Sequence, residues 1–118
     1  MATTTLYGIK NCDTVKKARR WLEQHGIEYL FHDFRADGLS PETFALWLEQ
    51  VGAATLINKR STTWKQLAEK DRTQVVEGDA ASIALQQPTL IKRPVLQYRK
   101  QVIVGFSDKI YRELMLIE

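Results

Sequence analysis

The sequence predicts a small α/β protein, in which a mixed β-sheet carries an inserted lobe of helices. Three observations lead to this fold class. Near the start, a β-branched and aromatic segment, Thr3–Tyr7, is separated from a second apolar segment, Ile27–Phe34, by residues with helical spacing. The middle of the chain has the periodicity and the caps of short helices. Near the end, two short β-type segments are close enough in sequence to form a hairpin.

The first two strands are predicted to be parallel, because a helix connects them. This helix is expected to run from about Asp13 to about His25. The residues that set these limits are Gly8 at the end of the first strand, the loop Ile9–Asn11, the apolar face Val15, Ala18 and Leu22, and Gly26 in the C′ position.

Helical patterns predominate from about residue 38 to residue 88. The clearest helix has Ser40 as its N-cap, Pro41 at its first position and Gly52 just beyond its end. We expect three shorter helical turns after it. Their predicted caps are Thr62 or Thr63, then Asp71 and Asp79, and their apolar residues include Trp64, Leu67, Val75 and Val76. The clearest helix has Phe44, Trp47, Leu48 and Val51 on one face.

The C-terminal part predicts an antiparallel hairpin and a final helix. Val95–Tyr98 and Val102–Val104 flank a three-residue connection, Arg99–Gln101. Ser107 then caps a helix. The apolar face of this helix is predicted to consist of Ile110, Leu114 and Ile117.

This order of elements, β-α-β, a helical insertion and β-β-α, is that of a thioredoxin-like (glutaredoxin-like) core with an extra lobe. We expect the core to comprise residues 1–37 and 89–118 and the lobe to comprise residues 38–88, within a single domain of residues 1–118.

The composition excludes several classes of protein. No apolar stretch approaches the roughly 20 residues of a membrane-spanning helix, and we find no export signal. The net charge of +3 is too small an excess to imply nucleic-acid binding. A single cysteine cannot form an intramolecular disulfide, and a lone thiol is easiest to maintain in a reducing compartment. We therefore expect a cytoplasmic monomer that binds neither membrane nor nucleic acid.

Cys12, the only cysteine, lies where the first predicted strand leads into the first predicted helix. Unpaired N–H groups and the helix dipole stabilise an anion there, which favours the reactive thiolate. The alternative is a small buried hydrophobic residue, which the polar neighbours Asn11, Asp13 and Thr14 disfavour. The basic residues between Lys10 and Arg20 form a solvated helix face or also steer an anionic ligand, and the sequence leaves both open.

The chain cannot close its own disulfide after Cys12 has attacked a substrate. In a C-x-x-C motif the resolving cysteine would stand where this chain has Val15. An external thiol must therefore finish the reaction. Glutathione suits this role because it is small, anionic and abundant in the inferred compartment.

Two arginines are candidates for binding an anionic partner. Arg60 is predicted to lie in a loop, and Arg93 directly precedes Pro94, at a bond that can be cis ahead of a strand. A guanidinium group suits bidentate contact with an oxyanion or a carboxylate, although an isolated arginine is more often a surface charge.

The histidines and tryptophans are expected to have structural roles. His25 and His32 have no cysteine or paired carboxylates at ligand spacing, so we infer no metal site. Trp21, Trp47 and Trp64 each lie in a helical pattern, which favours core or lobe packing over a stacking platform for nucleic acid.

The segments LYGIKNCDTVKKARRWL, INKRSTTWKQL, QQPTLIKRPVL and GFSDKIY occur in this order over nearly the whole chain. In these segments the chain resembles the family that comprises the glutaredoxin-coupled arsenate reductases (ArsC), the Spx regulators and the YffB-like proteins. The FHDFRADGL stretch is most similar to the YffB branch. The resemblance implies a thioredoxin-like sheet with a helical lobe, a nucleophilic Cys12, anion-binding Arg60 and Arg93, and a cis Pro94.

Two positions depart from the specialised members of this family. Arsenate reductases carry a further arginine shortly after the hairpin, where this chain has Gly105 and Phe106. Redox-sensing Spx proteins have a second cysteine at the position of Val15. Neither specialised activity therefore transfers directly.

The function we expect is that of a glutathione-dependent thiol–disulfide reductase. Cys12 forms the mixed disulfide, and Arg60 and Arg93 hold the anionic partner, with Pro94 beside it. We expect Lys10, Asn11 and Thr14, which flank Cys12, to contribute to substrate binding as well. No bound cofactor is expected. Glutathione is the co-substrate, the substrate is a disulfide or an oxyanion, and glutaredoxin is a further candidate partner. The alternatives are an Spx-like regulator that binds RNA polymerase and a true arsenate reductase.

Overall fold

The computed structural model describes residues 4–77 and 80–115, which form two compact units. The first, here called the sheet unit, comprises the chain up to Asp33 and from Arg93 onward, and the second, the helical unit, comprises Phe34–Lys92. The division thus falls after residues 33 and 92, whereas the sequence predicted it after residues 37 and 88.

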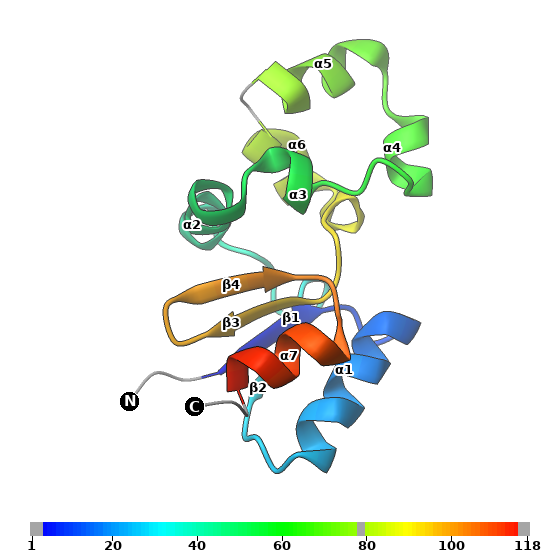
Figure 1. Ribbon diagram of the computed structural model, residues 1–118. Coiled ribbons are helices and arrows are strands. Elements are labelled where there is room, and N and C mark those ends of the chain that lie inside the picture. The colour runs from blue at the N-terminus through cyan, green and yellow to red at the C-terminus, as the bar shows by residue number, and fades with distance from the viewer. Residues whose placement is uncertain (1–3, 78–79, 116–118) are drawn as a thin grey trace. The chain divides into compact units, whose positions relative to one another are not determined.

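The sheet unit contains a four-stranded mixed sheet in the order β2-β1-β3-β4 (Figure 1). Its strands are β1 (Thr5–Gly8), β2 (Leu30–Asp33), β3 (Val95–Tyr98) and β4 (Gln101–Val104). β1 pairs in parallel with β2 and antiparallel with β3, and β3 pairs antiparallel with β4. The predicted fold class, the parallel pair and the hairpin are therefore confirmed.

The ends of three predicted strands were wrong. The first strand begins at Thr5 rather than before it and includes Gly8. The second strand begins at Leu30 rather than Ile27, because the Ile27 N–H donates to the Leu22 carbonyl and so still belongs to the end of the preceding helix. The hairpin connection has two residues rather than three, because Gln101 pairs with Tyr98. Residue 3 of the predicted first strand lies outside the described residues.

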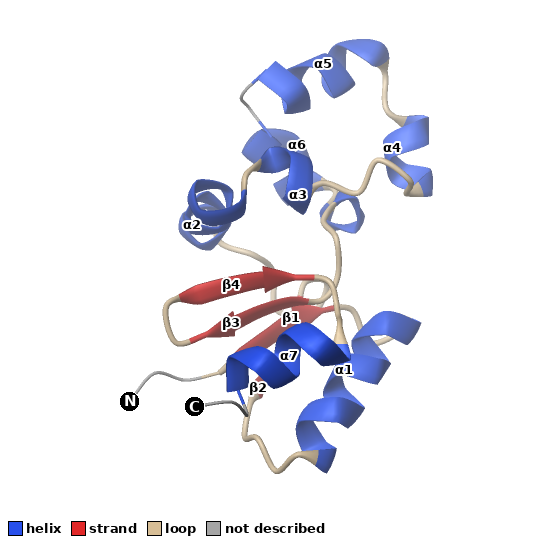
Figure 2. Ribbon diagram, in the orientation of Figure 1, coloured by secondary structure: helices blue, strands red, loops and turns tan. Residues whose placement is uncertain are grey.

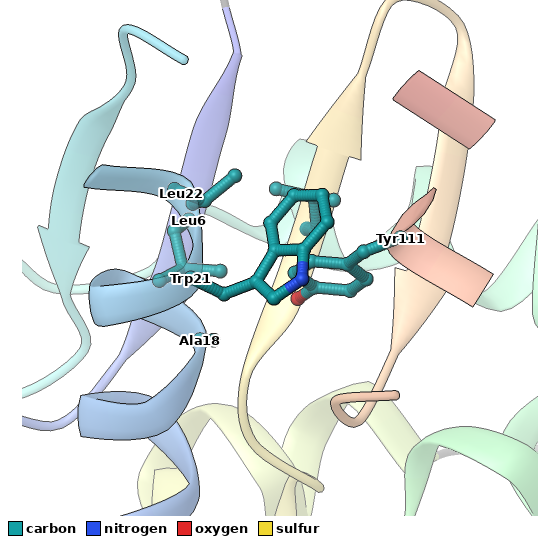
Figure 3. Packing of buried hydrophobic residues seen from close by; sticks show 6 residues of the cluster. Leu6, Ala18, Trp21, Leu22 and Tyr111 are labelled. Atoms are coloured by element: carbon teal, nitrogen blue, oxygen red, sulfur yellow. The ribbon is translucent and has the colours of Figure 1, made fainter. Parts of the chain in front are cut away.

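Two helices pack on one face of this sheet, α1 (Asp13–Gln24) and α7 (Asp108–Met115). Figure 3 shows the core between them, in which the Trp21 indole lies against the Tyr111 ring. The buried residues of this core cluster are Leu6, Ala18, Trp21, Leu22, Leu96 and Tyr111. The predicted limits of the first helix and its apolar face are confirmed.

The final helix begins after Ser107 as predicted, and the Ser107 hydroxyl accepts the Ile110 N–H at 3.3 Å. Of its predicted apolar face, Leu114 packs against the core cluster as expected, but the prediction for Ile110 was wrong. Ile110 is 48% exposed, whereas Tyr111 is fully buried. Tyr111 packs edge-on against both Trp21 and Phe106, and this large aromatic contact turns the neighbouring residue toward solvent. Residue 117 of the predicted face lies outside the described residues.

The helical unit is built from short helices, coloured blue in Figure 2. They are α2 (Pro41–Val51), α3 (Ala53–Leu56), α4 (Thr62–Gln66), α5 (Glu69–Glu77), α6 (Ala80–Gln86) and the 3-10 turn η1 (Pro88–Leu90). The prediction for α2 is confirmed: the Ser40 hydroxyl accepts the Thr43 N–H, and Gly52 follows with a positive φ of 80°. Phe44 and Trp47 are buried on its inner side.

Two predictions for this unit need correction, and one helix was missed. Ser61, not Thr62 or Thr63, caps α4, because its hydroxyl accepts the Trp64 N–H. Asp71 lies in the first turn of α5 rather than at its cap, since that helix already begins at Glu69. The short α3 was not predicted. The predicted cap at residue 79 and the predicted helix end at residue 78 lie outside the described residues.

Within residues 4–77 and 80–115, no helix is both long enough and apolar enough to cross a membrane.

Candidate active site at the carboxyl edge of the sheet

Cys12 is the N-cap residue of α1, as the sequence predicted from its place between strand and helix. Its backbone is extended (φ −129°, ψ 122°), and its carbonyl accepts the first helical hydrogen bond, from the Lys16 N–H at 2.9 Å. In the described part of the chain, no side chain caps this helix end. The thiol is half-buried and forms no disulfide. It therefore lies among the unpaired amide groups of the first helical turn, where an anion is stabilised.

The start of β3 lies at the same edge of the sheet as Cys12. Tyr7 pairs with Val95, so Pro94 comes beside Gly8 and the loop that leads to Cys12. The Arg93–Pro94 peptide bond is cis, as the resemblance implied. Pro94 is buried, and its carbonyl accepts the Gly105 N–H at 2.8 Å. Burial raises the pKa of the Tyr7 phenol, so this group stays protonated.

The other residues expected in the sheet unit differ in exposure. Arg93 is half-buried at the start of β3. Lys10 and Asn11 are exposed in the loop after β1, and Thr14 is exposed in the first turn of α1. Solvent-facing polar groups thus flank the thiol on both sides in sequence, which leaves them available to a polar ligand.

Arg60 lies in the helical unit, in a loop that its neighbours hold in place. The Asn58 side chain accepts the Arg60 N–H at 3.0 Å, and the Ser61 hydroxyl donates to the Asn58 carbonyl at 2.8 Å. Asn58 in turn donates its own N–H to the Leu90 carbonyl at 2.7 Å. The Arg60 side chain is exposed. The backbone around this arginine is therefore fixed while its guanidinium group faces solvent.

The basic residues of α1 are not equivalent. Arg19 lies over the Phe31 ring, 4.3 Å from its centroid, and its Nε donates to the Tyr29 hydroxyl at 3.1 Å. This arginine therefore has a packing role between α1 and β2. Lys16 and Lys17, by contrast, are exposed. Only part of the basic stretch is left to steer an anionic ligand.

The three residues at which this chain departs from its specialised relatives have structural roles. Gly105 has a positive φ of 85°, a conformation that favours glycine, and it bonds to Pro94. Phe106 packs edge-on against Tyr111 at a centroid distance of 4.9 Å. Val15, at the place of a resolving cysteine, is fully buried against Gly8.

The histidines make packing contacts in the sheet unit. The His25 Nδ1–H donates to the Trp21 carbonyl at 2.8 Å, and its ring stacks on the Trp21 indole. The His32 ring lies 4.8 Å from that of Tyr7. Among the described residues, no three histidine, cysteine or acidic side chains gather where they could hold a metal ion.

Sequence reasoning missed one buried ionisable residue near the site, Asp33, which ends β2 beside Gly8. The FHDFRADGL stretch contains it, but nothing in the alternation of that segment distinguished a buried aspartate from an exposed one. The predicted parallel pairing of the first two strands could have placed Asp33 near the site, because the last residues of two parallel strands lie at the same edge of the sheet.

Comparison with known proteins gives one consistent family. The profile of the ArsC family matches residues 7–114. An uncharacterized protein of Haemophilus influenzae is 45% identical over 108 residues, which cover 92% of this chain and 95% of that protein. Among solved structures, the YFFB (PA3664) protein is 41% identical with a TM-score of 0.90, over 94% of this chain and 97% of that chain. An arsenate reductase (ArsC) related protein from Brucella melitensis is 45% identical with a TM-score of 0.75, over 95% and 93% of the two chains.

Transcriptional regulators are more distant relatives. The global transcriptional regulator Spx of Lactiplantibacillus plantarum is 27% identical over 112 residues, which cover 93% of this chain and 84% of that protein.

Proposed function

Because this chain belongs to the ArsC family, we propose that it is a thiol–disulfide oxidoreductase that uses glutathione as its reducing co-substrate. The observation that carries the proposal is the state of Cys12, which is a free, half-buried thiol at the N-cap of α1. It lies at the edge of the sheet where the cis Pro94 directly precedes β3. A helix N-terminus favours the thiolate, which is the form that attacks a disulfide.

The reaction needs two exchanges, because the chain has one cysteine. The Cys12 thiolate attacks the glutathione sulfur of a mixed disulfide; the substrate S–S bond breaks, and the substrate sulfur leaves with the electron pair and takes up a proton. A second glutathione, as its thiolate, then attacks the sulfur of glutathione bound to Cys12. Glutathione disulfide leaves, and Cys12 returns as the thiolate.

Binding of glutathione requires cations for its two carboxylates. In the sheet unit, Arg93 and Lys10 supply a guanidinium and an ammonium group, and Asn11 and Thr14 supply polar side chains next to the thiol. Arg60 is assigned the same role from the family resemblance. No resident cofactor is needed, since glutathione is consumed as a substrate. Glutaredoxin is a further partner that the proposal admits.

The direct test is incubation with glutathione disulfide followed by intact-mass analysis. We expect one glutathionyl adduct in the wild-type protein and none in Cys12→Ser. Loss of the adduct on treatment with glutathione would complete the cycle. A wild-type protein that stays unmodified at millimolar glutathione disulfide, while a small alkylating reagent still reacts with Cys12, would refute glutathione as the partner.

The role of Arg93 is tested against a matched arginine. Arg93→Ala removes a charge-assisted contact, so kcat/KM for a glutathione mixed disulfide is expected to fall by roughly 10- to 100-fold. Arg99 lies exposed in the β3–β4 turn of the same unit, and Arg99→Ala is expected to change kcat/KM by less than about twofold. Equal effects of the two changes would remove Arg93 from the site.

Arsenate is the second candidate substrate, favoured by the family. An oxyanion beside a thiolate must be surrounded by cations. At the place where arsenate reductases have a further arginine, this chain has Gly105 and Phe106, which have structural roles and carry no charge. We expect arsenate turnover to be lower than turnover of a glutathione mixed disulfide by roughly one to two powers of ten, with glutathione and glutaredoxin supplied. Arsenate turnover of equal or higher catalytic efficiency would make this chain an arsenate reductase.

A regulator that binds RNA polymerase is the second candidate from another class, and the Spx relative favours it. A polymerase-binding module has no need of Cys12 or Arg93. Sedimentation of the protein with and without purified RNA polymerase tests this candidate and also the expected monomeric state. Co-sedimentation that is unchanged in Cys12→Ser would support the regulator.

A further inference from the structure

Asp33 is a buried carboxylate that no step of the proposed reaction uses. Its side chain is 7% exposed, and it is the only acidic residue that is buried in the described part of the chain. It ends β2 and pairs with Gly8, the last residue of β1. The loop to Cys12 departs directly after Gly8, so Asp33 lies at the same edge of the sheet as the thiol.

Asp33 faces the side of the sheet that α1 covers. Side chains alternate along a strand, and Phe31, two residues before Asp33, packs against the core cluster on this side. Gly8 has the same orientation, because a Cβ added to it would meet Val15 Cγ2 of α1 at 2.7 Å. The carboxylate is therefore enclosed beneath the first turn of α1.

Two contacts show that α1 is antiparallel to the segment of residues 29–33, which includes β2. Tyr29 donates its hydroxyl proton to Glu23 at 2.7 Å, and Arg19 lies over Phe31. Two residues along a strand advance roughly 6.6 Å, slightly more than one helical turn of about 5.4 Å. The next step from Phe31 therefore brings Asp33 opposite residues about one turn before Arg19.

These residues are Lys16 and Cys12, which continue the stripe of Arg19 and Glu23 at helical spacing. The charged and titratable groups around this edge are Asp13, Lys16 and Arg19 on α1, Cys12 at its N-cap, Lys10 in the preceding loop and Arg93 before β3. His32, the neighbour of Asp33 in sequence, lies on the opposite face against Tyr7.

We propose that Asp33 is a positioning residue that sets the pH range in which Cys12 reacts, because its enclosed carboxylate, at the same edge of the sheet, opposes formation of the thiolate. Two negative charges in one site repel each other, and a buried charge is poorly screened by solvent. The repulsion between Asp33 and the thiolate would favour the proposed reaction, because a more basic thiolate is a stronger nucleophile toward a disulfide. This inference rests on Cys12 being the reactive thiol of the proposed function.

The test compares two aspartates that lie near Cys12 in different surroundings. Asp33→Asn removes the enclosed charge, and Asp13→Asn removes an exposed charge next to Cys12 in sequence. The readout is the rate of Cys12 alkylation by the neutral reagent iodoacetamide against pH, with the melting temperature measured in parallel. We expect the rate at pH 6 to rise on the order of tenfold in Asp33→Asn, and by about twofold or less in Asp13→Asn.

A merely structural Asp33, which holds the turn after β2, would lower the melting temperature without moving the alkylation profile. A shift in Asp33→Asn no larger than that in Asp13→Asn would overturn the proposal.

A second measurement uses the unmodified side chain, in case Asp33→Asn does not fold. The carboxyl carbon of Asp33 is followed by NMR from acid to alkaline pH in the wild-type protein and in Cys12→Ser. We expect a second inflection in the Asp33 signal where Cys12 ionises, and no such inflection in Cys12→Ser. An Asp33 signal that is the same in both proteins would overturn the proposal.

Neither measurement contains glutathione, so the two proposals can fail separately. Coupling between Asp33 and Cys12 without a glutathionyl adduct would refute only the co-substrate, and an adduct without coupling would refute only the role of Asp33.

Discussion

The two ends of α1 are built for different purposes. At its C-terminal end, Trp21 stacks on His25 at 4.0 Å, packs edge-on against Tyr111 at 5.4 Å, and donates its indole N–H to Asp108 of α7. At its N-terminal end, Cys12 is half-buried, and no side chain of the described residues caps the helix. One end is fixed by aromatic packing, and the other keeps its amide groups available to an anion.

One helix therefore holds the fold at one end and carries a free thiol at the other. Burial of large aromatic side chains supplies much of the stability of a small core. A thiolate at a helix N-terminus needs only the local amide groups and an approach for the ligand. Substitutions at the two ends are therefore expected to change different properties.

Trp21→Ala is expected to give the largest loss of stability. It removes a buried ring together with its contacts to His25 and Tyr111, and such truncations cost about 3–5 kcal/mol. The free energy of unfolding in urea measures this loss. If the two ends are independent, the alkylation rate of Cys12 in the folded variant stays within about twofold of wild type. A large change in that rate would show that the two ends of α1 are coupled.

Gly8→Ala should couple the two properties, because Gly8 contacts the helix one turn after Cys12. A Cβ at this position would lie 2.7 Å from Val15 Cγ2 and 3.2 Å from Cγ1, so the first turn of α1 must shift. Overpacking of this kind costs about 1–3 kcal/mol. We expect lower stability and an altered alkylation rate together.

The matched control for Gly8→Ala is the double variant with Val15→Ala, which removes both clashing methyl groups. If the clash causes the effect, the double variant loses less stability than the sum of the single variants. Strict additivity would contradict the steric explanation.

Tyr111→Phe is expected to have a small effect on stability although the side chain is fully buried. The Tyr111 hydroxyl has no hydrogen-bond partner among the described residues, and burial raises its pKa well above the ordinary value. Removal of an unsatisfied hydroxyl forfeits no bond and keeps the ring contacts with Trp21 and Phe106. We expect the free energy of unfolding to change by less than about 1 kcal/mol, or to increase. A larger loss would reveal a bridging water.

The sequence predicted the surroundings of the N-terminal end of α1 better than those of its C-terminal end. The position of Cys12 follows from local rules, because a strand, a loop and a helix with apolar spacing are visible within the first 25 residues. The partner of Trp21 was not predictable in this way. Tyr111 and Asp108 lie some 90 residues later, and periodicity could not tell whether Ile110 or its neighbour faces the core.

The same distinction explains the other misses. Ser61 competes with two threonines for one cap, and a choice among adjacent hydroxyl residues depends on the geometry of the entering loop. The burial of Asp33 depends on strand pairing between residues 25 positions apart, Gly8 and Asp33. The role of Arg60 came from the family resemblance, since a lone arginine in a loop has no local pattern that reveals its ligand.

The smallest expected effect concerns the pH dependence of the aromatic end. The Trp21 indole N–H, and secondarily the Arg112 side chain, hold the pKa of Asp108 below its ordinary value of 3.8. Since the folded pKa is the lower one, the ionised carboxylate contributes stability that is fully present above about pH 3.8 and is lost as the pH falls through the folded pKa.

Asp108→Asn keeps an oxygen that can accept the indole proton but removes the charge. We expect the difference in stability between wild type and this variant to be constant from pH 7 to pH 5 and to shrink below about pH 3.8. Because Asp108 is exposed, the difference should also decrease in high salt. Urea unfolding at each pH measures it, with Asp13→Asn, an exposed aspartate in the first turn of α1, as the control. A difference that persists unchanged at pH 3 would mean that Asp108 acts through the geometry of its hydrogen bond alone, and the C-terminal end of α1 would then be held entirely by packing.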